Sequence, residues 1–472
     1  MSIHQNRWSF WIDRGGTFTD IVAIGPDGGL RTHKLLSRSP AYGDPAVAGI
    51  KALMGGRIDP DQIAAIHLGT TVATNALLER KGAKLALLTT KGLRDQLRIG
   101  VQARPKLFVR QIVLPEQLYA AVIEIDERIG AQGEVLSPLN LDAAMPAMRK
   151  AVAAGAVSAA VVLMHSYRYP AHEQAVAKAA RDAGFTHVST GHEVSPLMKF
   201  VPRAGTTVAD AYLSPVLNAY IDELAQELGP VARDGRLKFM RSDGGLSAAG
   251  HFRAKDAILS GPAGGVVGQA ATAKASGFSR SIGFDMGGTS TDVSRFDGEY
   301  ERLTEAEIAG VKLRVPMLAI HTVAAGGGSI LTLEGGRMRA GPESAGSDPG
   351  PACYRRGGPL TVTDANVMTG RLSPAHFPAI FGPGGDRTLD ADIVREKFTA
   401  LSAASGKTPE ELAGGFLDIA VANMAEAIKR ISVQRGYDVR EYVLNAFGGA
   451  GGQLACRVAD ALGMREIMVH PL

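Results

Sequence analysis

Cysteine and excess charge are both scarce in this 472-residue sequence. Its two cysteines, Cys353 and Cys456, are too few for a disulfide framework or for a zinc site built from several cysteines. Lys and Arg total 51 against 47 Asp and Glu. The net charge of +4 is too small over this length to indicate a nucleic-acid-binding surface, so we expect none.

Long apolar runs are missing as well. The polar N-terminus lacks the apolar core of a signal peptide. The longest mainly apolar stretch, residues 151–164, is shorter than the ~20 residues that a membrane span requires. The length predicts two or three domains. We therefore expect a cytoplasmic protein with no membrane partner.

Several familiar motifs are also absent. Residues 406–408 (Gly-Lys-Thr) resemble the end of a Walker A loop, but Leu401 stands where that loop needs a glycine. No Gly-x-Gly-x-x-Gly and no Gly-x-Ser-x-Gly occurs. The His-Glu pairs at 172–173 and 192–193 lack the second histidine of a zinc protease. These residues exclude simple P-loop, dinucleotide-binding and hydrolase interpretations.

Glycine, in contrast, is abundant: 57 residues, about 12% of the chain against a usual share of about 7%. The glycines follow strand-like runs. Residues 9–12 and 281–284 each lead into the pattern Asp-x-Gly-Gly-Thr-x-Thr-Asp, at 13–20 and 285–292, and a second strand follows each copy. This duplicated hairpin is the most specific feature of the sequence.

The chemistry of the pattern indicates a phosphate site. Adjacent glycines let backbone N–H groups approach an anion, and threonine hydroxyls add donors. An aspartate at a strand end can hold Mg²⁺ beside phosphates, usually through water. We predict that the two hairpins face each other and clamp a nucleotide's phosphates; a plain glycine-turn hairpin explains one copy better than two. The predicted contacts are Gly15, Gly16, Thr17, Thr19, Gly287, Gly288, Thr289 and Thr291, with Asp13 and Asp285 for magnesium and catalysis.

A third glycine cluster lies at residues 446–453, between a strand-like run at 442–444 and a helix-like run at 454–462. Glycines at such a junction leave room for a base or ribose, and a helix N-terminus favours anions. A tight turn between small residues is the alternative. The predicted adenosine-pocket residues are Gly448, Gly449, Gly451 and Gly452.

Strand-like and helix-like runs alternate along the chain, which predicts an α/β protein. We expect strands at 84–89 and 158–164 and helices at 141–154, 206–228 and 417–435. Two lobes are predicted, 1–203 and 204–472. Small-residue clusters at 260–265, 324–329 and 341–354 are interpreted as loops. A strand-to-helix junction at 69–78 offers candidate substrate contacts, with helix capping as the alternative: Thr70, Thr71, Thr74 and Asn75.

Together these residues resemble the hydantoinase A/5-oxoprolinase family of the actin-like ATPase superfamily. The resemblance is carried by residues 10–20, 68–76, 285–292, 341–354 and 447–452. The start of the chain and residues 164–168 are more similar to 5-oxoprolinases than to the carboxylase branches. The resemblance implies two ribonuclease H-like lobes, ATP and Mg²⁺ as cofactors, and ATP-dependent opening of 5-oxo-L-proline to L-glutamate.

The resemblance also implies that this chain is the ATP-binding portion of an oligomeric enzyme with a hydantoinase B-like subunit or domain. Phosphorylation of the amide oxygen would make that oxygen a leaving group, with either Asp13 or Asp285 as the carboxylate nearest the chemistry. Other members with the same motifs are N-methylhydantoin hydrolases and ATP-using subunits of ketone carboxylases. A small-molecule kinase of the same superfold and a non-enzymatic filament or chaperone module also stay open.

Overall fold

The chain folds into two compact units: Met1–Gly261 with Arg302–Met317, and Pro262–Glu301 with Leu318–Leu472. Both contain sheets covered by helices, which confirms the predicted α/β class. The expected boundary at 203–204 falls inside the first unit, because helix α7 (Phe200–Leu228) crosses it. The computed structural model describes residues 6–16, 18–37, 39, 41–101, 108–114, 116–377, 379–403 and 405–471. Within these ranges no helix has the length and apolar character to cross a bilayer.

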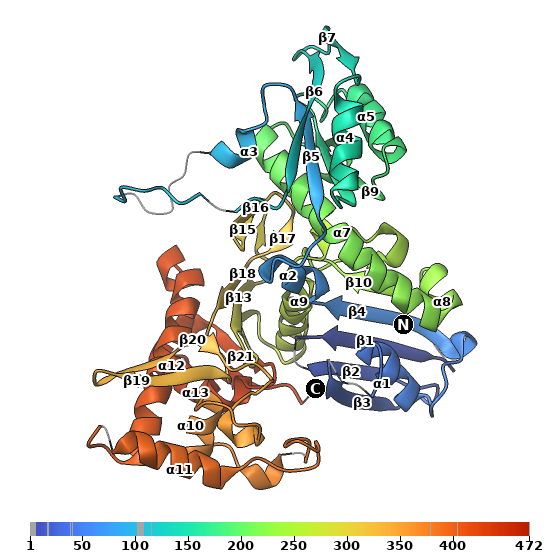
Figure 1. Cartoon of the computed structure of the whole chain (residues 1–472). Helices are drawn as coiled ribbons and strands as arrows, with labels where there is room; N and C mark the ends of the chain where they lie inside the picture. Colours follow the sequence, from blue (N-terminus) through green and yellow to red (C-terminus); the bar gives the residue numbers. More distant parts are fainter. Residues whose placement is uncertain are drawn as a thin grey trace. The chain divides into compact units, whose positions relative to one another are not determined.

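A six-stranded sheet in the first unit carries the first glycine hairpin (Figure 1). β1 pairs with β2 antiparallel and with β4 parallel. Helix α1 (Pro45–Leu53) packs on this sheet, and the Asp44 carboxylate caps it by accepting hydrogen bonds from the amides of Ala46 and Val47. In spatial order the strands are β11 (Leu246–Ala248), β10 (Leu237–Met240), β4 (Ile63–Thr70), β1 (Trp8–Arg14), β2 (Phe18–Ile24) and β3 (Leu30–Leu36).

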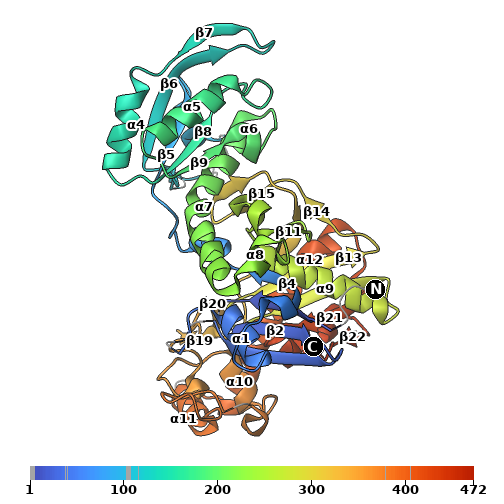
Figure 2. The same ribbon diagram turned by 90° about the vertical axis from the view of Figure 1, so that its right-hand side faces the viewer.

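A second, five-stranded sheet in the same unit is parallel except for β7. Its strands β5 and β8 are buried throughout, as parallel strands covered on both faces usually are. Helices α4 (Ala144–Ala153) and α5 (Ala171–Asp182) cover one face (Figure 2). The predicted strands and helix in this region are confirmed within a few residues. In spatial order the strands are β7 (Val135–Asn140), β6 (Ala121–Ile129), β5 (Leu85–Thr90), β8 (Ser158–Val162) and β9 (His187–Thr190).

Helix α7 confirms the helix predicted at 206–228 but begins six residues earlier, at Phe200. Its first turn contains Arg203, a fully buried arginine. The Arg203 guanidinium donates hydrogen bonds to four main-chain carbonyls, at 2.7–2.9 Å. Two of these follow β8 and two precede α7, so Arg203 fixes both segments. The acceptors are the carbonyls of Leu163, Met164, Leu197 and Met198.

The second unit is built on a five-stranded sheet in which β12 pairs with β13 antiparallel and with β21 parallel. The β12–β13 hairpin carries the second glycine pattern. A separate hairpin, β19 (Ser329–Glu334) with β20 (Arg337–Ser344), packs against the same core. In spatial order the strands are β18 (Ile320–Val323), β13 (Thr291–Asp297), β12 (Arg280–Met286), β21 (Val443–Phe447) and β22 (Ile467–Met468).

In the part of this unit that the structure describes, four α-helices contribute buried residues to this core. The helix predicted at 417–435 is shifted: α12 begins after the Thr408 cap, whose hydroxyl accepts from the Glu411 amide, and ends at Ile431. The helix predicted at 454–462 is confirmed and begins at Gly451. The four are α10 (Val362–Met368), α11 (Ala391–Ser402), α12 (Pro409–Ile431) and α13 (Gly451–Leu462).

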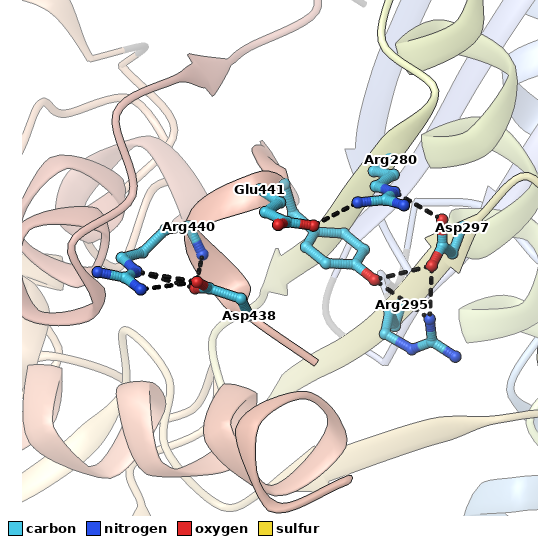
Figure 3. Close-up of polar contacts among 7 residues, drawn as sticks. Arg280, Arg295, Asp297, Asp438, Arg440 and Glu441 are labelled. Atoms are coloured by element: carbon cyan, nitrogen blue, oxygen red, sulfur yellow. Dashed lines mark hydrogen bonds and ion pairs between the residues drawn. The ribbon is translucent and has the colours of Figure 1, made fainter. Parts of the chain in front are cut away.

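A network of charged residues joins the start of β12 to the chain segment before β21 (Figure 3). Arg280 donates to Asp297 at 2.9 Å and also bonds to Glu441. Arg295 donates to Asp297 and to the Tyr442 hydroxyl at 3.4 and 3.3 Å. Exposed ion pairs add little stability individually. The network's contribution is to hold β12, β13 and β21 together at the ends opposite the glycine turn.

Two of the three clusters interpreted as loops belong, wholly or in part, to regular secondary structure. Residues 260–265 form the first turns of helix α9 (Ser260–Ala275), because Leu259 turns the chain with a φ of +62° and Pro262 is tolerated in a first helical turn. The first part of 341–354 belongs to strand β20. The cluster at 324–329 connects β18 to β19, as expected.

Candidate functional site

The first glycine hairpin places Asp13 at the carboxyl end of β1, opposite Asp20 of β2. The turn is closed by a hydrogen bond from the Gly15 amide to the Phe18 carbonyl, 3.1 Å long. Gly16 is exposed at the tip of the bend. Thr17, predicted as a phosphate contact, lies outside the described residues.

The second hairpin repeats this geometry position by position. Asp285 lies opposite Asp292, and the Gly287 amide donates to the Ser290 carbonyl at 3.0 Å. Gly288 and Thr289 are exposed. The sequence repeat is therefore also a repeat of strand register and of turn hydrogen bonding, one copy in each unit.

Two of the predicted threonine contacts lie behind the turns, where both are fully buried. The Thr19 hydroxyl pairs with Ser37 at 2.9 Å, and Ser37 donates onward to the Gly15 carbonyl at 2.7 Å. The Thr291 hydroxyl donates to the Ala325 carbonyl at 2.5 Å. These hydroxyls brace the bends from inside. Of the predicted threonine donors that are described, Thr289 is the one exposed to solvent.

The Asp13 side chain is solvent-exposed, yet it stands among the ends of β1, β4 and α9. A Cβ added to Gly69 or to Gly261 would lie 3.5 or 3.6 Å from its Oδ1 atom. Surrounding protein removes enough water to raise the pKa of Asp13 to about 6; the charge of Asp20 adds to this shift and Lys34 opposes it. A carboxylate in this setting gains free energy from a nearby cation.

The third glycine cluster meets the second hairpin at Asp285. β21 runs parallel to β12 and places Phe447 beside Asp285, so the chain turns into α13 at the same sheet edge. Gly448 has a φ of +80°, and a Cβ there would lie 2.3 Å from the Asp285 Oδ1 atom. Gly448 must therefore be glycine.

The other glycines of this cluster differ from Gly448. Added Cβ atoms at Gly449 and Gly452 would meet nothing within 4 Å, and both residues are exposed. Gly451 is buried as the first residue of α13. A Cβ on Gly265 of α9 would lie 3.4 Å from the Asp285 Oδ2 atom. The structure thus brings the predicted adenosine cluster to the predicted magnesium ligand of the same unit.

Sequence reasoning missed the role of the glycines at 326–328. The amides of Gly327 and Gly328 donate to the carbonyls of Gly287 and Gly288, at 3.0 and 2.6 Å. A Cβ on Gly326 would lie within 2.9 Å of three backbone atoms of the second turn. This buried loop supports the bend from behind. Three consecutive glycines indicate a close approach between backbone segments, but the sequence alone does not identify the second segment.

The four candidate substrate contacts separate into two pairs. The Thr70 and Thr74 side chains are buried, and Thr74 accepts a hydrogen bond from the Leu259 amide at 3.0 Å. Thr71 and Asn75, on helix α2 (Val72–Leu78) and its cap, line a pocket of about 220 Å³ beside Gly15 and Gly16. Thr71 donates to the Arg14 carbonyl at 3.2 Å, which ties the helix to the bend.

The described residues contain no cluster of three or more His, Cys, Asp or Glu side chains able to cage a metal ion. Magnesium does not need such a cage, since one or two carboxylates and substrate phosphates commonly hold it with water. Asp13 and Asp285, each at a strand end beside a glycine bend, fit that requirement.

The chain belongs to the hydantoinase/oxoprolinase family. Residues 203–472 match the family described as Hydantoinase/oxoprolinase, and residues 9–184 match the Hydantoinase/oxoprolinase N-terminal region. The predicted family is confirmed. The second matched region begins at residue 203, next to the expected boundary at 203–204, whereas the compact units divide after Gly261.

Among its relatives, 5-oxoprolinase 1 of Arabidopsis thaliana is 43% identical over 99% of this chain and 40% of its own length. The 5-oxoprolinase of Saccharomyces cerevisiae is 43% identical over 97% of this chain and 39% of its own length. Caprolactamase subunit alpha of Pseudomonas jessenii is 34% identical, over 98% of this chain and 68% of that subunit. The chain thus spans about 40% of the length of the 5-oxoprolinases it matches.

Solved structures share the fold. ATP-dependent caprolactamase from Pseudomonas jessenii aligns with a TM-score of 0.79 at 32% identity, over 98% of this chain and 68% of that one. A nucleotide-free acetone carboxylase aligns with a TM-score of 0.80 at 23% identity, over 97% of this chain and 68% of that one. The assignment to the actin-like ATPase superfold stays a prediction.

Proposed function

We propose that this chain is the ATP-binding portion of an ATP-dependent enzyme that opens a cyclic amide, 5-oxo-L-proline being the substrate we favour. The observation that carries the proposal is the repeated bend: Asp13 and Asp285 occupy the same register position before two glycine turns closed by the same hydrogen bond. The 43% identity to 5-oxoprolinases supports this substrate over a hydantoin or a ketone.

Activation by ATP suits this substrate chemically, because a five-membered lactam is a poor electrophile. Transfer of the γ-phosphoryl group to the amide oxygen releases ADP and converts that oxygen into a leaving group. One water then attacks the ring carbon, the carbon–nitrogen bond breaks and the nitrogen takes up a proton, which leaves an acyl phosphate. A second water attacks the carbonyl carbon of this acyl phosphate, the carbon–oxygen bond to phosphate breaks, and glutamate and phosphate are released. Phosphoryl transfer asks the protein mainly for positioning and charge neutralisation.

The residues of each unit would supply these functions. In each bend one glycine amide, that of Gly15 or Gly287, closes the turn, and the next amide, that of Gly16 or Gly288, would donate to phosphate oxygens. Asp13 and Asp285 would hold Mg²⁺, which neutralises phosphate charge when bound. The exposed Gly449 and Gly452 leave space for adenosine. A hydantoinase B-like subunit or domain would complete the enzyme, as we infer from a relative named as a subunit.

Calorimetry on the purified chain tests the proposal. We expect one adenine nucleotide per chain, bound at least tenfold more tightly with Mg²⁺ than with a chelator. Asp13→Asn and Asp285→Asn should each remove most of this magnesium advantage. With a hydantoinase B-like protein added, they should slow ATP hydrolysis about 100-fold, the usual effect of losing one charge-stabilising group.

Asp126→Asn, an exposed change on β6 of the other sheet, is the matched control and should bind MgATP like the wild type. No nucleotide uptake by the folded wild-type chain, or unchanged magnesium dependence in both variants, would contradict the proposal. A stable phosphorylated product in place of free phosphate would indicate a small-molecule kinase instead.

A further inference from the structure

The pocket beside the first hairpin has a volume of about 220 Å³, below the ~300–1,000 Å³ of pockets for drug-sized ligands, and this volume suits a single small ring. All of its lining residues belong to the first unit. Because it adjoins Gly15 and Gly16, a molecule bound there would lie next to the proposed phosphate bend.

The walls of this pocket combine an apolar side with cationic groups. Val72 and Ala76 of α2 and Val216 of α7 provide the apolar surface. Arg14 and Lys81 are the cations of the lining, and Glu79, paired with Lys81, is its carboxylate. Such walls match a small anion that also carries an apolar ring, and a bare phosphate would make no use of the apolar side.

Arg14 is the better placed of the two cations. Its guanidinium carbon lies 4.5 Å from the centroid of the Tyr220 ring, and its Nη1 atom lies 3.1 Å from Asp44 Oδ2. That Nη1 atom is buried against Asp44, so the exposed 21% of the Arg14 side chain is the part that can meet a ligand. Lys81 is paired with Glu79 and is 72% exposed, so the protein holds it less firmly in place. The planar guanidinium fork matches a carboxylate.

The hairpin itself does not require an arginine here. In the second hairpin Met286 occupies the position of Arg14, with the same strand register and the same turn hydrogen bond. The bend therefore forms equally with an uncharged side chain. The turn therefore does not account for Arg14, which pairs with Asp44 on one side and lines the pocket on the other.

We propose that this pocket binds the cyclic amide, and that Arg14 selects substrates that carry a carboxylate beside the ring nitrogen. The inference rests on the proposed function and deepens it. 5-oxo-L-proline has such a carboxylate, whereas 2-pyrrolidinone is the same ring without it. Arg14 here is a specificity residue, since it contacts a part of the substrate that does not react.

Ligand-observed NMR titrations of both lactams test the assignment, with MgATP affinity measured on the same samples. We expect wild-type protein to bind 5-oxo-L-proline at least tenfold more tightly than 2-pyrrolidinone. Arg14→Met, which installs the residue of the second hairpin, should weaken 5-oxo-L-proline binding about 10- to 100-fold, as loss of a charge-assisted hydrogen bond predicts. It should leave 2-pyrrolidinone and MgATP within about threefold of their wild-type affinities.

Arg14→Met leaves the buried Asp44 carboxylate without its cation, so Arg14→Met/Asp44→Asn is the second variant, in which asparagine keeps the cap of α1. Arg94→Met, at an exposed arginine of the same unit, is the control for loss of charge and should retain the carboxylate preference.

The experiment distinguishes failure of the role assigned to Arg14 from failure of the proposed function. MgATP binding with equal affinity for both lactams would overturn the role of Arg14 and leave the proposed function standing. Displacement of 5-oxo-L-proline by inorganic phosphate at equal concentration would reassign the pocket to phosphate and also overturn it. Absence of MgATP binding by the wild type would remove the proposed function, and this inference with it.

Discussion

At the scale of single residues, Asp13 illustrates a conflict between stability and the proposed function. Its raised pKa, about 6 against an ordinary 3.8, means that the folded protein holds the proton more tightly than the unfolded chain does. Above pH 6 the ionised carboxylate therefore destabilises the fold. This cost diminishes as the pH falls from 6 and disappears below 3.8, where both states are protonated.

We expect Asp13→Asn to unfold at a higher urea concentration than the wild type at pH 8, because asparagine carries no charge to desolvate. The difference between the two urea midpoints should narrow as the pH falls from 8 to 5. Urea unfolding monitored by circular dichroism at both pH values measures it. Asp126→Asn is the control and should show no such trend; a gap for Asp13→Asn that widens towards pH 5 would contradict the assignment.

At the scale of elements, each glycine hairpin is supported from behind by a buried threonine. Thr19 and Thr291 hold equivalent positions, but their partners differ: a serine hydroxyl at 37 in one unit and a main-chain carbonyl at 325 in the other. The shape of each bend therefore depends on hydrogen bonds to chain segments that lie far away in the sequence.

Two threonines of the second hairpin allow structural support of the bend to be distinguished from contact with the nucleotide. Thr291→Val should lower the free energy of unfolding by about 1–3 kcal/mol, because it removes a buried hydrogen bond to the Ala325 carbonyl. Thr289→Val, at an exposed position, should change it by less than ~0.5 kcal/mol but weaken MgATP binding. Denaturant titration and calorimetry give both quantities, and the reverse pattern would show that Thr291 faces the ligand.

Much of each hairpin was predictable at this scale, because the Asp-x-Gly-Gly-Thr-x-Thr-Asp pattern specifies strand, turn and register within one short segment. Helix α9 was not predictable, because glycines at 261, 264 and 265 suggest a loop. In the structure, Gly261 and Gly265 let this helix approach aspartate side chains. The support given by residues 326–328 and by Ser37 was equally hidden. These contacts are long-range, and one sequence does not state which distant segments meet.

At the scale of the whole molecule, the chain covers about 40% of the length of the 5-oxoprolinases. We therefore expect the isolated chain to bind MgATP but to release little phosphate when 5-oxo-L-proline is added. Addition of a hydantoinase B-like protein should raise 5-oxo-L-proline-dependent phosphate release at least tenfold. Phosphate assays with each component alone and with both together measure this, and full stimulation of the isolated chain would contradict it.

The order in which the chain visits its two units has a practical consequence. The polypeptide leaves the first unit within α9, returns to it for residues 302–317 and leaves it again. Neither unit is a single uninterrupted stretch of polypeptide. A gene truncated at one point would express a half that misses a piece of its own structure, so an independently folding unit would require a splice that joins its two separated segments.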